Sequence, residues 1–361
     1  MSPNEEEPFR YFVDNPPVYI TTMHLSCMYS IPVFLMAAYC IIYASPPQMG
    51  KFKWVQLYHV SCSFLLEISL TLCGTPVLYL SVPGGYPRGV FKVLGLCTRI
   101  QALLGITLLD CTAVSIVMLF YFRMEHVLPR THLLVPPIWL RNTILIGGFI
   151  FQILCSYMNW RIIILDDANF KQTIDKKYTI IPASLRDSET VLIDCRVSAC
   201  KLSLSILGSC LAVGAVAIVL MVSYSYYYLR SQSVHLSSRT IRLQKTFLLL
   251  LLIQVSVHTV AFLIPVTVLM SSYWLTASQD LVNACVYLVS VNGTAGTLTM
   301  LITTRFYRRE VIRIILMLRK KTQSAIVQPT TVMSISNSNR EQSLRNNRRN
   351  LTTCFHMKNK Q

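Results

Sequence analysis

Seven long apolar runs dominate this sequence, and they constrain its fold more than any other feature. A helix needs roughly 20 mostly apolar residues to cross the hydrocarbon core of a bilayer. Only 14% of the 361 residues are charged, against about 25% in soluble globular domains. The expected spans are residues 19–44, 55–82, 93–122, 142–160, 200–229, 246–271 and 281–304. We therefore predict an all-α membrane protein with a seven-transmembrane helix bundle over residues 19–304, in which Pro76 and Pro265 kink their helices.

The basic residues of the loops indicate how the chain is oriented. Lys and Arg accumulate in the short cytoplasmic loops of membrane proteins. With the N-terminus outside, the three inner loops hold nine basic residues against one acid, Glu125, whereas the N-terminal segment and the two short outer loops hold three. This asymmetry predicts an extracellular N-terminus, residues 1–18, and a cytoplasmic C-terminus.

Two further segments follow the last span. Residues 305–321, RFYRREVIRIILMLRKK, alternate apolar and basic side chains, which is typical of an amphipathic helix on the anionic inner leaflet. A positive stop signal after the last span would have the same composition, and both interpretations place the segment in the cytoplasm. Residues 322–361 are rich in Ser, Thr, Asn and Gln and are expected to form a disordered cytoplasmic tail.

The charge and the motifs argue against several other classes of protein. The net charge of +17 is concentrated late in the chain, because 13 of the 33 Lys and Arg lie from Arg305 onward. A nucleic-acid-binding protein would gather such charge on a soluble fold, so no nucleic-acid partner is expected. The sequence has no zinc-type cysteine spacing, no phosphate-binding loop and no hydrolase motif. We therefore expect no enzymatic activity, metal or cofactor.

Ionisable residues within the spans are the candidates for function. Such groups are costly in a bilayer and usually face the bundle interior. Arg99 and Asp110 are eleven residues apart and lie on nearly the same helix face, with Leu103 and Ile106 between them. This stripe could line a ligand pocket with His258 of the sixth span. Two alternatives stay open: Arg99 extends to the outer headgroups, and His258 is a structural hydrogen-bond partner.

Several strings, taken in order along residues 31–308, resemble one receptor family. The resemblance is to the nematode chemoreceptors called serpentine receptor class h, which are similar to G-protein-coupled receptors. The strings are IPVF and YASPPQM within 31–49, FLLEISL at 64–70, TPVLYL and GGYPRG within 75–89, LQKTFLLLLLIQ at 243–254 with the later Pro265, and NGTAGTLTMLITTRFYR at 292–308.

The resemblance implies roles for particular residues. Glu67, Asp110 and Asn292 would converge in a polar centre that holds a sodium ion or a shared proton. The alternative is a protonated acid that is hydrogen-bonded to a neighbouring helix. Cys97 and Cys195 would form the disulfide common in G-protein-coupled receptors, although two free cysteines fit the sequence as well.

At the inner end of the third span the family tends to read Glu-Asn-Arg. This chain has Tyr121, Phe122 and Arg123 there, so only the arginine is retained. The resemblance implies that the basic inner ends of the spans face a heterotrimeric G protein. The residues concerned are Arg123, Arg239, Arg242 and Lys245.

Together these features predict a chemosensory receptor that binds a small molecule between the outer halves of its helices and signals through a heterotrimeric G protein. By resemblance it would lie in the plasma membrane, in the sensory cilium of neurons, in contact with membrane lipid. A ligand-gated ion channel and a small-molecule transporter are the alternatives. A transporter often shows an internal repeat, which this sequence lacks, and the loop charges oppose the inverted orientation of insect-type odorant channels.

Overall fold

The structure is a computed structural model, and part of the chain is described in it. The described residues are 9, 11–79, 84–128, 132, 135–164, 167–187, 190–192, 198–231, 246, 249–250, 252–271, 278–320 and 322–323. They belong to two compact units, Met1–Tyr307 and Arg308–Gln361.

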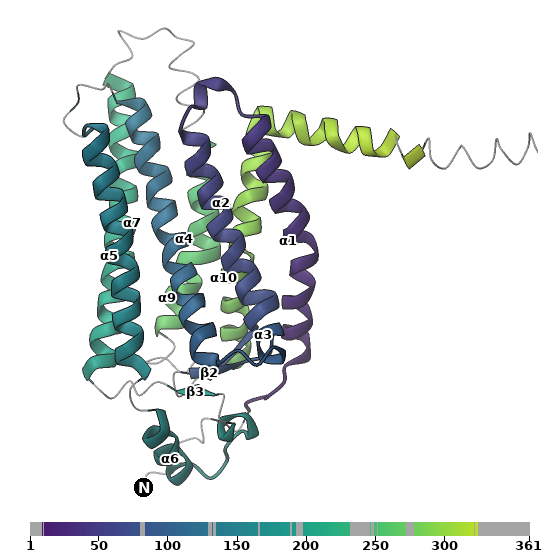
Figure 1. Cartoon of the computed structure of the whole chain (residues 1–361), viewed down its shortest axis with the longest axis vertical. Helices are drawn as coiled ribbons and strands as arrows, with labels where there is room; N and C mark the ends of the chain where they lie inside the picture. The colour runs from purple at the N-terminus through teal and green to yellow at the C-terminus, as the bar shows by residue number, and fades with distance from the viewer. Residues whose placement is uncertain are drawn as a thin grey trace, which may run out of the picture. The chain divides into compact units, whose positions relative to one another are not determined.

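Seven helices of the first unit, among the residues described, are long and apolar enough to cross a membrane. They lie side by side in one bundle (Figure 1), as the sequence predicts. Their bounds are α1 Pro17–Tyr43, α2 Phe52–Ile68, α4 Thr98–Val127, α5 Ile138–Ile164, α7 Ser198–Ser231, a sixth span Leu252–Ser271 that ends in α9 Ile264–Ser271, and α10 Gln279–Thr303.

The second span ends earlier than the sequence analysis predicts. A π-helical turn, Ser69–Gly74, extends α2, and Thr75 then adopts a left-handed conformation with φ of 41°. That conformation breaks the helix, and the following Pro76 has no N–H with which to continue it. Pro76 therefore begins a strand, and the prediction that it kinks a span is wrong.

A small antiparallel sheet is an addition to the predicted all-α fold. Its strands are β1 Pro76–Tyr79, β2 Gly84–Pro87 and β3 Val191–Leu192, in the order β1-β2-β3. Pro76 pairs with Pro87 in the first ladder, and Gly84 pairs with Leu192 in the second. The sheet lies at one end of the bundle, below the ends of the helices in Figure 1. We call this end the sheet end.

The sixth span changes its helical geometry near its proline. Its helix widens into a π-helical turn, Thr259–Leu263, directly before α9. Pro265 lies in the first turn of α9, where its ring and its missing N–H would otherwise disturb the hydrogen bonds of the preceding turn. A π-turn is a common way to accommodate such a disturbance, as expected for a kink at this proline.

An apolar cluster fills the sheet end. It joins the N-terminal segment, α1, α10, the sheet and two short helices, α6 Asp167–Lys177 and the 3₁₀ turn Ala183–Arg186. A further short helix, α3 Val90–Val93, follows β2. Phe9, Tyr19, Val77, Leu185 and Val282 are buried members of the cluster. Their burial attaches the loops of this end to the bundle.

The described part of the second unit is helical. Residues 308–320 are helical, within the segment predicted as an amphipathic helix. Its Ile312, Ile315, Leu316 and Leu318 are exposed beside several arginines. Exposed apolar side chains beside basic ones fit a membrane surface. Most of the predicted tail, residues 324–361, lies outside the described residues.

Candidate functional site

A cavity of about 150 Å³ lies in the bundle between α4, α5, α7 and the sixth span. Its wall is mostly apolar, with Leu211, Ile218 and Phe262 among the lining residues. A cavity of this character, with a few polar groups, is the usual form of a small-molecule site. Its polar and sulfur-bearing lining residues are Asp110, Gln152, Cys210, His258 and Thr259.

Asp110 supplies the cavity with a carboxylate. The side chain is 6% exposed and accepts a hydrogen bond from the Ser156 hydroxyl of α5. Ser156 is also within hydrogen-bond distance of the Gln152 carbonyl oxygen, at 3.0 Å. Asp110 is thus oriented by α5, and one wall of the cavity carries an acid.

His258 connects the cavity to a chain of buried polar contacts across four spans. Its Nδ1 lies 2.8 Å from Asn292 Oδ1 of α10, and its Nε2 lies 3.3 Å from His59 Nε2 of α2. The other ring nitrogen of His59 lies 2.8 Å from the Ser115 hydroxyl of α4. Because the Asn292 amide oxygen can only accept, His258 Nδ1 donates to it, and in a neutral ring His258 Nε2 then accepts from the N–H of His59.

Gly296 of α10 makes room for this chain. A Cβ atom at Gly296 would lie 2.7 Å from His258 Cε1, closer than a van der Waals contact allows. The glycine therefore lets the imidazole approach α10 closely enough to bond to Asn292.

Glu67, two turns farther along α2 than His59, belongs to a separate polar cluster. It is fully buried, and one carboxylate oxygen accepts a hydrogen bond from Ser30 of α1. The other accepts from the backbone N–H and the hydroxyl of Thr294, at 2.9 and 2.7 Å. Three donors from two helices thus satisfy this acid, in line with the alternative that it is hydrogen-bonded to its neighbours.

The structure gives Glu67, Asp110 and Asn292 different hydrogen-bond partners, not the one shared site that the resemblance implies. Asp110 is bonded to Ser156, Asn292 to His258, and Glu67 to Ser30 and Thr294. The reason is geometric, because α2 turns Glu67 toward α1 and α10, whereas Asp110 on α4 faces α5 and the cavity. No group of three His, Cys, Asp or Glu side chains that could hold a metal ion occurs among the residues described.

The predicted ligand stripe is only partly in place. Asp110 and His258 line the cavity together, so this part of the predicted pocket is found. Leu103 and Ile106 are half-buried and are not among the residues that line it, and Arg99 is exposed in the first turn of α4. The cavity therefore lies deeper along α4 than the sequence analysis places it.

The remaining candidates at the sheet end are two cysteines. Cys97 is exposed and free at the start of α4, and Cys195 lies outside the described residues. The disulfide between them therefore stays a prediction.

The opposite end of the bundle contains the predicted arginine of the third span. The Arg123 guanidinium lies 3.8 Å from the centre of the Phe52 ring of α2, a cation–π contact. Close by along α4, Glu125 forms an ion pair with Arg141 of α5. Arg239, Arg242 and Lys245 lie outside the described residues, so the predicted coupling surface is described only at Arg123.

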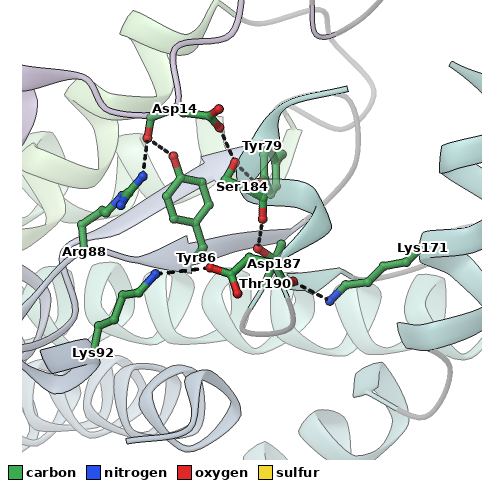
Figure 2. Close-up of polar contacts among 9 residues, drawn as sticks. All are labelled: Asp14, Tyr79, Tyr86, Arg88, Lys92, Lys171, Ser184, Asp187 and Thr190. Carbon is green, nitrogen blue, oxygen red and sulfur yellow. Dashed lines mark hydrogen bonds and ion pairs between the residues drawn. The ribbon is translucent and has the colours of Figure 1, made fainter. Parts of the chain in front are cut away.

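Polar contacts fasten the loops over the sheet end (Figure 2). The Tyr86 hydroxyl donates to the Asp14 backbone oxygen, and Ser184 donates to the Asp14 carboxylate. Tyr79 bonds to the same Ser184 at 2.7 Å. Burial raises the pKa of both tyrosines. We call the segments that carry the residues labelled in Figure 2, together with the contacts among them, the cap.

Sequence reasoning missed several residues that complete these sites. His59, Ser115 and Ser156 bond to predicted residues or their partners, as do Ser30 and Thr294. Each is a polar residue within an apolar span, which was a usable signal. Ser and Thr can also bond to the carbonyl of their own preceding turn, so their type alone does not predict a partner on another helix.

Comparisons with known proteins agree with this architecture. Residues 14–317 match the family model of the serpentine-type seven-transmembrane chemoreceptor Srh of the G-protein-coupled receptors. The chain therefore belongs to this chemoreceptor family, as the resemblance predicted, and it is a multi-pass membrane protein.

A solved structure supports the fold. Squid rhodopsin, at 10% sequence identity, superposes with a TM-score of 0.56 over 86% of this chain and 89% of the rhodopsin chain. At this identity the match shows the fold alone. No curated protein matches the sequence. Family and fold are those of receptors rather than of typical enzymes.

Proposed function

We propose that this protein is a chemosensory receptor that binds a small, largely apolar molecule in the cavity and signals through a heterotrimeric G protein. The observation that carries the proposal is the cavity itself, lined by four spans in the bundle of a chemoreceptor family. The ligand site proposed here lies around Asp110 and His258, deeper than the outer stripe of the sequence analysis.

The volume of the cavity limits the size of the ligand. An apolar cavity of about 150 Å³ stays dry and accommodates benzene. The cavity here has about the same volume, so we propose ligands of roughly five to eight non-hydrogen atoms, the size of one small ring. Small odorant-like molecules belong to this size class.

The polar chain gives such a ligand a route to the rest of the bundle. His258 lines the cavity and also bonds to Asn292 and His59. A ligand that displaces the sixth span by a fraction of an ångström would change these contacts, and buried polar networks tolerate few partial arrangements. We propose that the ligand favours one of two packings of the spans, which alters the end of the bundle that contains Arg123.

This proposal requires the orientation that the loop charges predict. The cap would face the outside of the cell, and Arg123 would face the G protein in the cytoplasm, together with Arg239, Arg242 and Lys245. An N-terminal epitope tag should then stain intact cells of the plasma membrane or sensory cilium, whereas a C-terminal tag should stain only permeabilised cells. The reverse staining would exclude G-protein coupling at the Arg123 end.

A filled cavity is the direct test of the ligand site. Ala215 on α7 lines the cavity, so Ala215→Phe should occupy its volume and abolish stabilisation of the purified receptor by a ring-sized probe such as cyclopentanol. Val216, the next residue, is 58% exposed and is not among the lining residues. Val216→Phe adds the same ring on the same helix and should leave probe binding unchanged.

The two variants also test signalling. In cells, Ala215→Phe should lose the ligand-dependent second-messenger response, and Val216→Phe should keep it. If Ala215→Phe binds the probe as tightly as the wild type does, the ligand site lies outside this cavity. A ligand-evoked current without G-protein activation would instead favour the ion-channel alternative.

A further inference from the structure

We infer that the cavity selects small amines in their cationic form, with the Asp110 carboxylate as the group that binds the ammonium. This inference rests on the proposed function, because it names the chemical class of ligand for the same cavity. It is argued from the charges of the residues that line the cavity and from the hydrogen bonds that these residues already make.

The cavity contains an acid without a matching cation. Asp110 is the acidic residue among the lining residues described, and none of those residues is a lysine or arginine. Its partners, the Ser156 hydroxyl and the Gln152 side-chain amide, are neutral, so they orient the carboxylate without balancing its charge. An ionised carboxylate in an apolar environment is costly unless a cation accompanies it.

The arginines of the same helix cannot supply that cation. Arg99 and Arg123 are 11 and 13 residues from Asp110, which corresponds to roughly 16 and 20 Å along a helix axis. Arg99 is exposed at the sheet end, and Arg123 lies over the Phe52 ring at the other end. Neither guanidinium reaches the level of the cavity, so a ligand is the available source of positive charge.

The other strong acceptor of the wall is already engaged. Both ring nitrogens of His258 are in hydrogen bonds, with Asn292 and His59. Gln152 and Thr259 also offer acceptor oxygens to the cavity, but both are neutral, so Asp110 is the charged acceptor among the lining residues described. The apolar wall formed by Leu211, Ile218 and Phe262 is left for the hydrocarbon part of the ligand, which gives a small amine two complementary contacts.

The same charge discriminates against other ligands. A carboxylic acid would bring a second negative charge next to Asp110, which is unfavourable in a low-dielectric site. A neutral alcohol would lose the charge-assisted part of the hydrogen bond. The inference thus predicts a fixed order of affinity, with amine above alcohol and alcohol above acid.

Four ring-shaped probes test this order on the purified wild-type chain at pH 7. They are cyclopentylamine, which is protonated at this pH as lysine is, cyclopentanol, cyclopentanone and cyclopentanecarboxylate. Affinities come from the thermal stabilisation that each probe produces as its concentration rises. A hydrogen bond to a charged group should give the amine roughly a 10–100-fold advantage over the alcohol.

Two acid-to-amide variants separate Asp110 from charge in general. Asp110→Asn should lower the amine affinity roughly 10–100-fold while the alcohol affinity changes less than about threefold. Glu67→Gln removes an equally buried acid that does not line the cavity, and it should preserve the order of the probes. If Asp110→Asn does not fold, the order measured on the wild type still decides.

Three outcomes would overturn the inference. Equal affinity of the wild type for amine and alcohol would show that charge plays no role in binding. An amine preference that survives Asp110→Asn would show that another residue binds the ammonium. Tighter binding of cyclopentanone than of the amine would make Asp110 a protonated donor. If any of these occurs while Ala215→Phe still abolishes probe binding, the cavity remains the ligand site and only the amine class fails. Probe binding that Ala215→Phe does not affect would overturn the proposed function as well.

Discussion

The two sides of the bundle differ sharply in how far their helices are buried. In α10 and α2, 61% and 44% of the membrane-spanning window is inside the protein, whereas in α5 and α7 the fractions are 6% and 0%. We call α1, α2 and α10 the core side, and α5 and α7 the wall side. Glu67 and its three donors lie on the core side, and the cavity borders the wall side.

This contrast suggests a division of labour between the two sides. Elements with few buried contacts open and shift at lower cost than elements in a dense core. We therefore expect the wall side to adapt to a ligand while the core side keeps its arrangement. The polar chain from Ser115 through His258 to Asn292 joins α4 and the sixth span, which line the cavity, to α2 and α10 of the core side.

The largest expected effect comes from replacing a glycine with leucine on the core side, compared with the same replacement on the wall side. A Cβ atom at Gly293 of α10 would be 2.7 Å from the Ser63 backbone oxygen of α2, whereas a Cβ at Gly148 of α5 would have nothing within 4 Å. Gly293→Leu should cost about 3 kcal/mol or prevent folding, because the backbone of Ser63 cannot move aside easily. Gly148→Leu should be neutral or slightly stabilising. Thermal unfolding and surface expression of both variants measure the difference, and equal losses would refute the contrast between the sides.

Glu67 allows the core side to be perturbed without a change of shape. Glu67→Leu would leave the buried backbone N–H of Thr294 without its acceptor and would remove one acceptor each from the Ser30 and Thr294 hydroxyls, which should cost about 1–3 kcal/mol. Glu67→Gln retains an acceptor oxygen and should be nearly neutral. Since both carboxylate oxygens already accept hydrogen bonds, probe affinity should be the same in sodium and in a large organic cation. A sodium dependence that disappears in Glu67→Gln would restore the predicted ion site.

The polar chain can be broken at a histidine of the core side. His59→Leu should cost about 1–2 kcal/mol, because it leaves the buried His258 Nε2 without a partner. We also expect a raised basal second-messenger level, since the contact that joins the second and sixth spans is lost. His132→Leu is the matched control on the wall side, where His132 Nε2 contacts the Tyr224 hydroxyl of α7 at 2.8 Å. Unchanged basal signalling in His59→Leu would show that this chain of polar contacts does not transmit the signal.

The sequence alone predicted the seven spans because each apolar run exceeds the length that a bilayer requires. It did not predict where the second span ends, since TPVLYL is as apolar as the helix before it. The local signals were present, because Gly74 and Pro76 flank Thr75, and such pairs commonly terminate helices. Hydropathy outweighed them in a chain whose spans are apolar all round.

The candidate site was less predictable for a different reason. The sequence identified Asp110, His258 and Glu67 as costly groups within the membrane, but it did not determine which helix each of them faces. That depends on the rotation of each helix, and helices that are apolar on every side give no periodic signal for it. The separation of Glu67 from Asp110 therefore became visible only in the packed bundle.

The cap should respond to alkaline pH, because burial raises the pKa of Tyr79 and Tyr86. Below about pH 10 these phenols are neutral in both the folded and the unfolded chain. Above it the unfolded chain ionises first, so stability should fall as the pH rises beyond about 10. Tyr79→Phe should reduce this loss, by about 1 kcal/mol at most. Melting temperatures at pH 8 and pH 10.5 for both chains provide the measurement, and an identical loss in the variant would contradict it.

The smallest effect is expected at the surface of the cap, where Lys92 and Asp187 form an ion pair at 3.4 Å with side chains that are 29% and 42% exposed (Figure 2). Exposed pairs contribute little, because water screens both charges and the side chains lose rotamer freedom. Lys171 Nζ lies 3.4 Å from the backbone oxygen of Asp187, a contact that survives a change of the Asp187 side chain. A double-mutant cycle of Lys92→Gln and Asp187→Asn should therefore give a coupling energy below about 0.5 kcal/mol, smaller still in high salt.

Asp14→Ala provides the comparison within the cap. It removes the carboxylate that accepts from Ser184 and from the backbone N–H of Ala183, and it should cost about 1 kcal/mol or more. A coupling energy above that cost would mean that surface charge fastens the cap. The cap would then loosen with salt independently of the core side, whose buried residues Tyr19 and Val282 otherwise hold it in place.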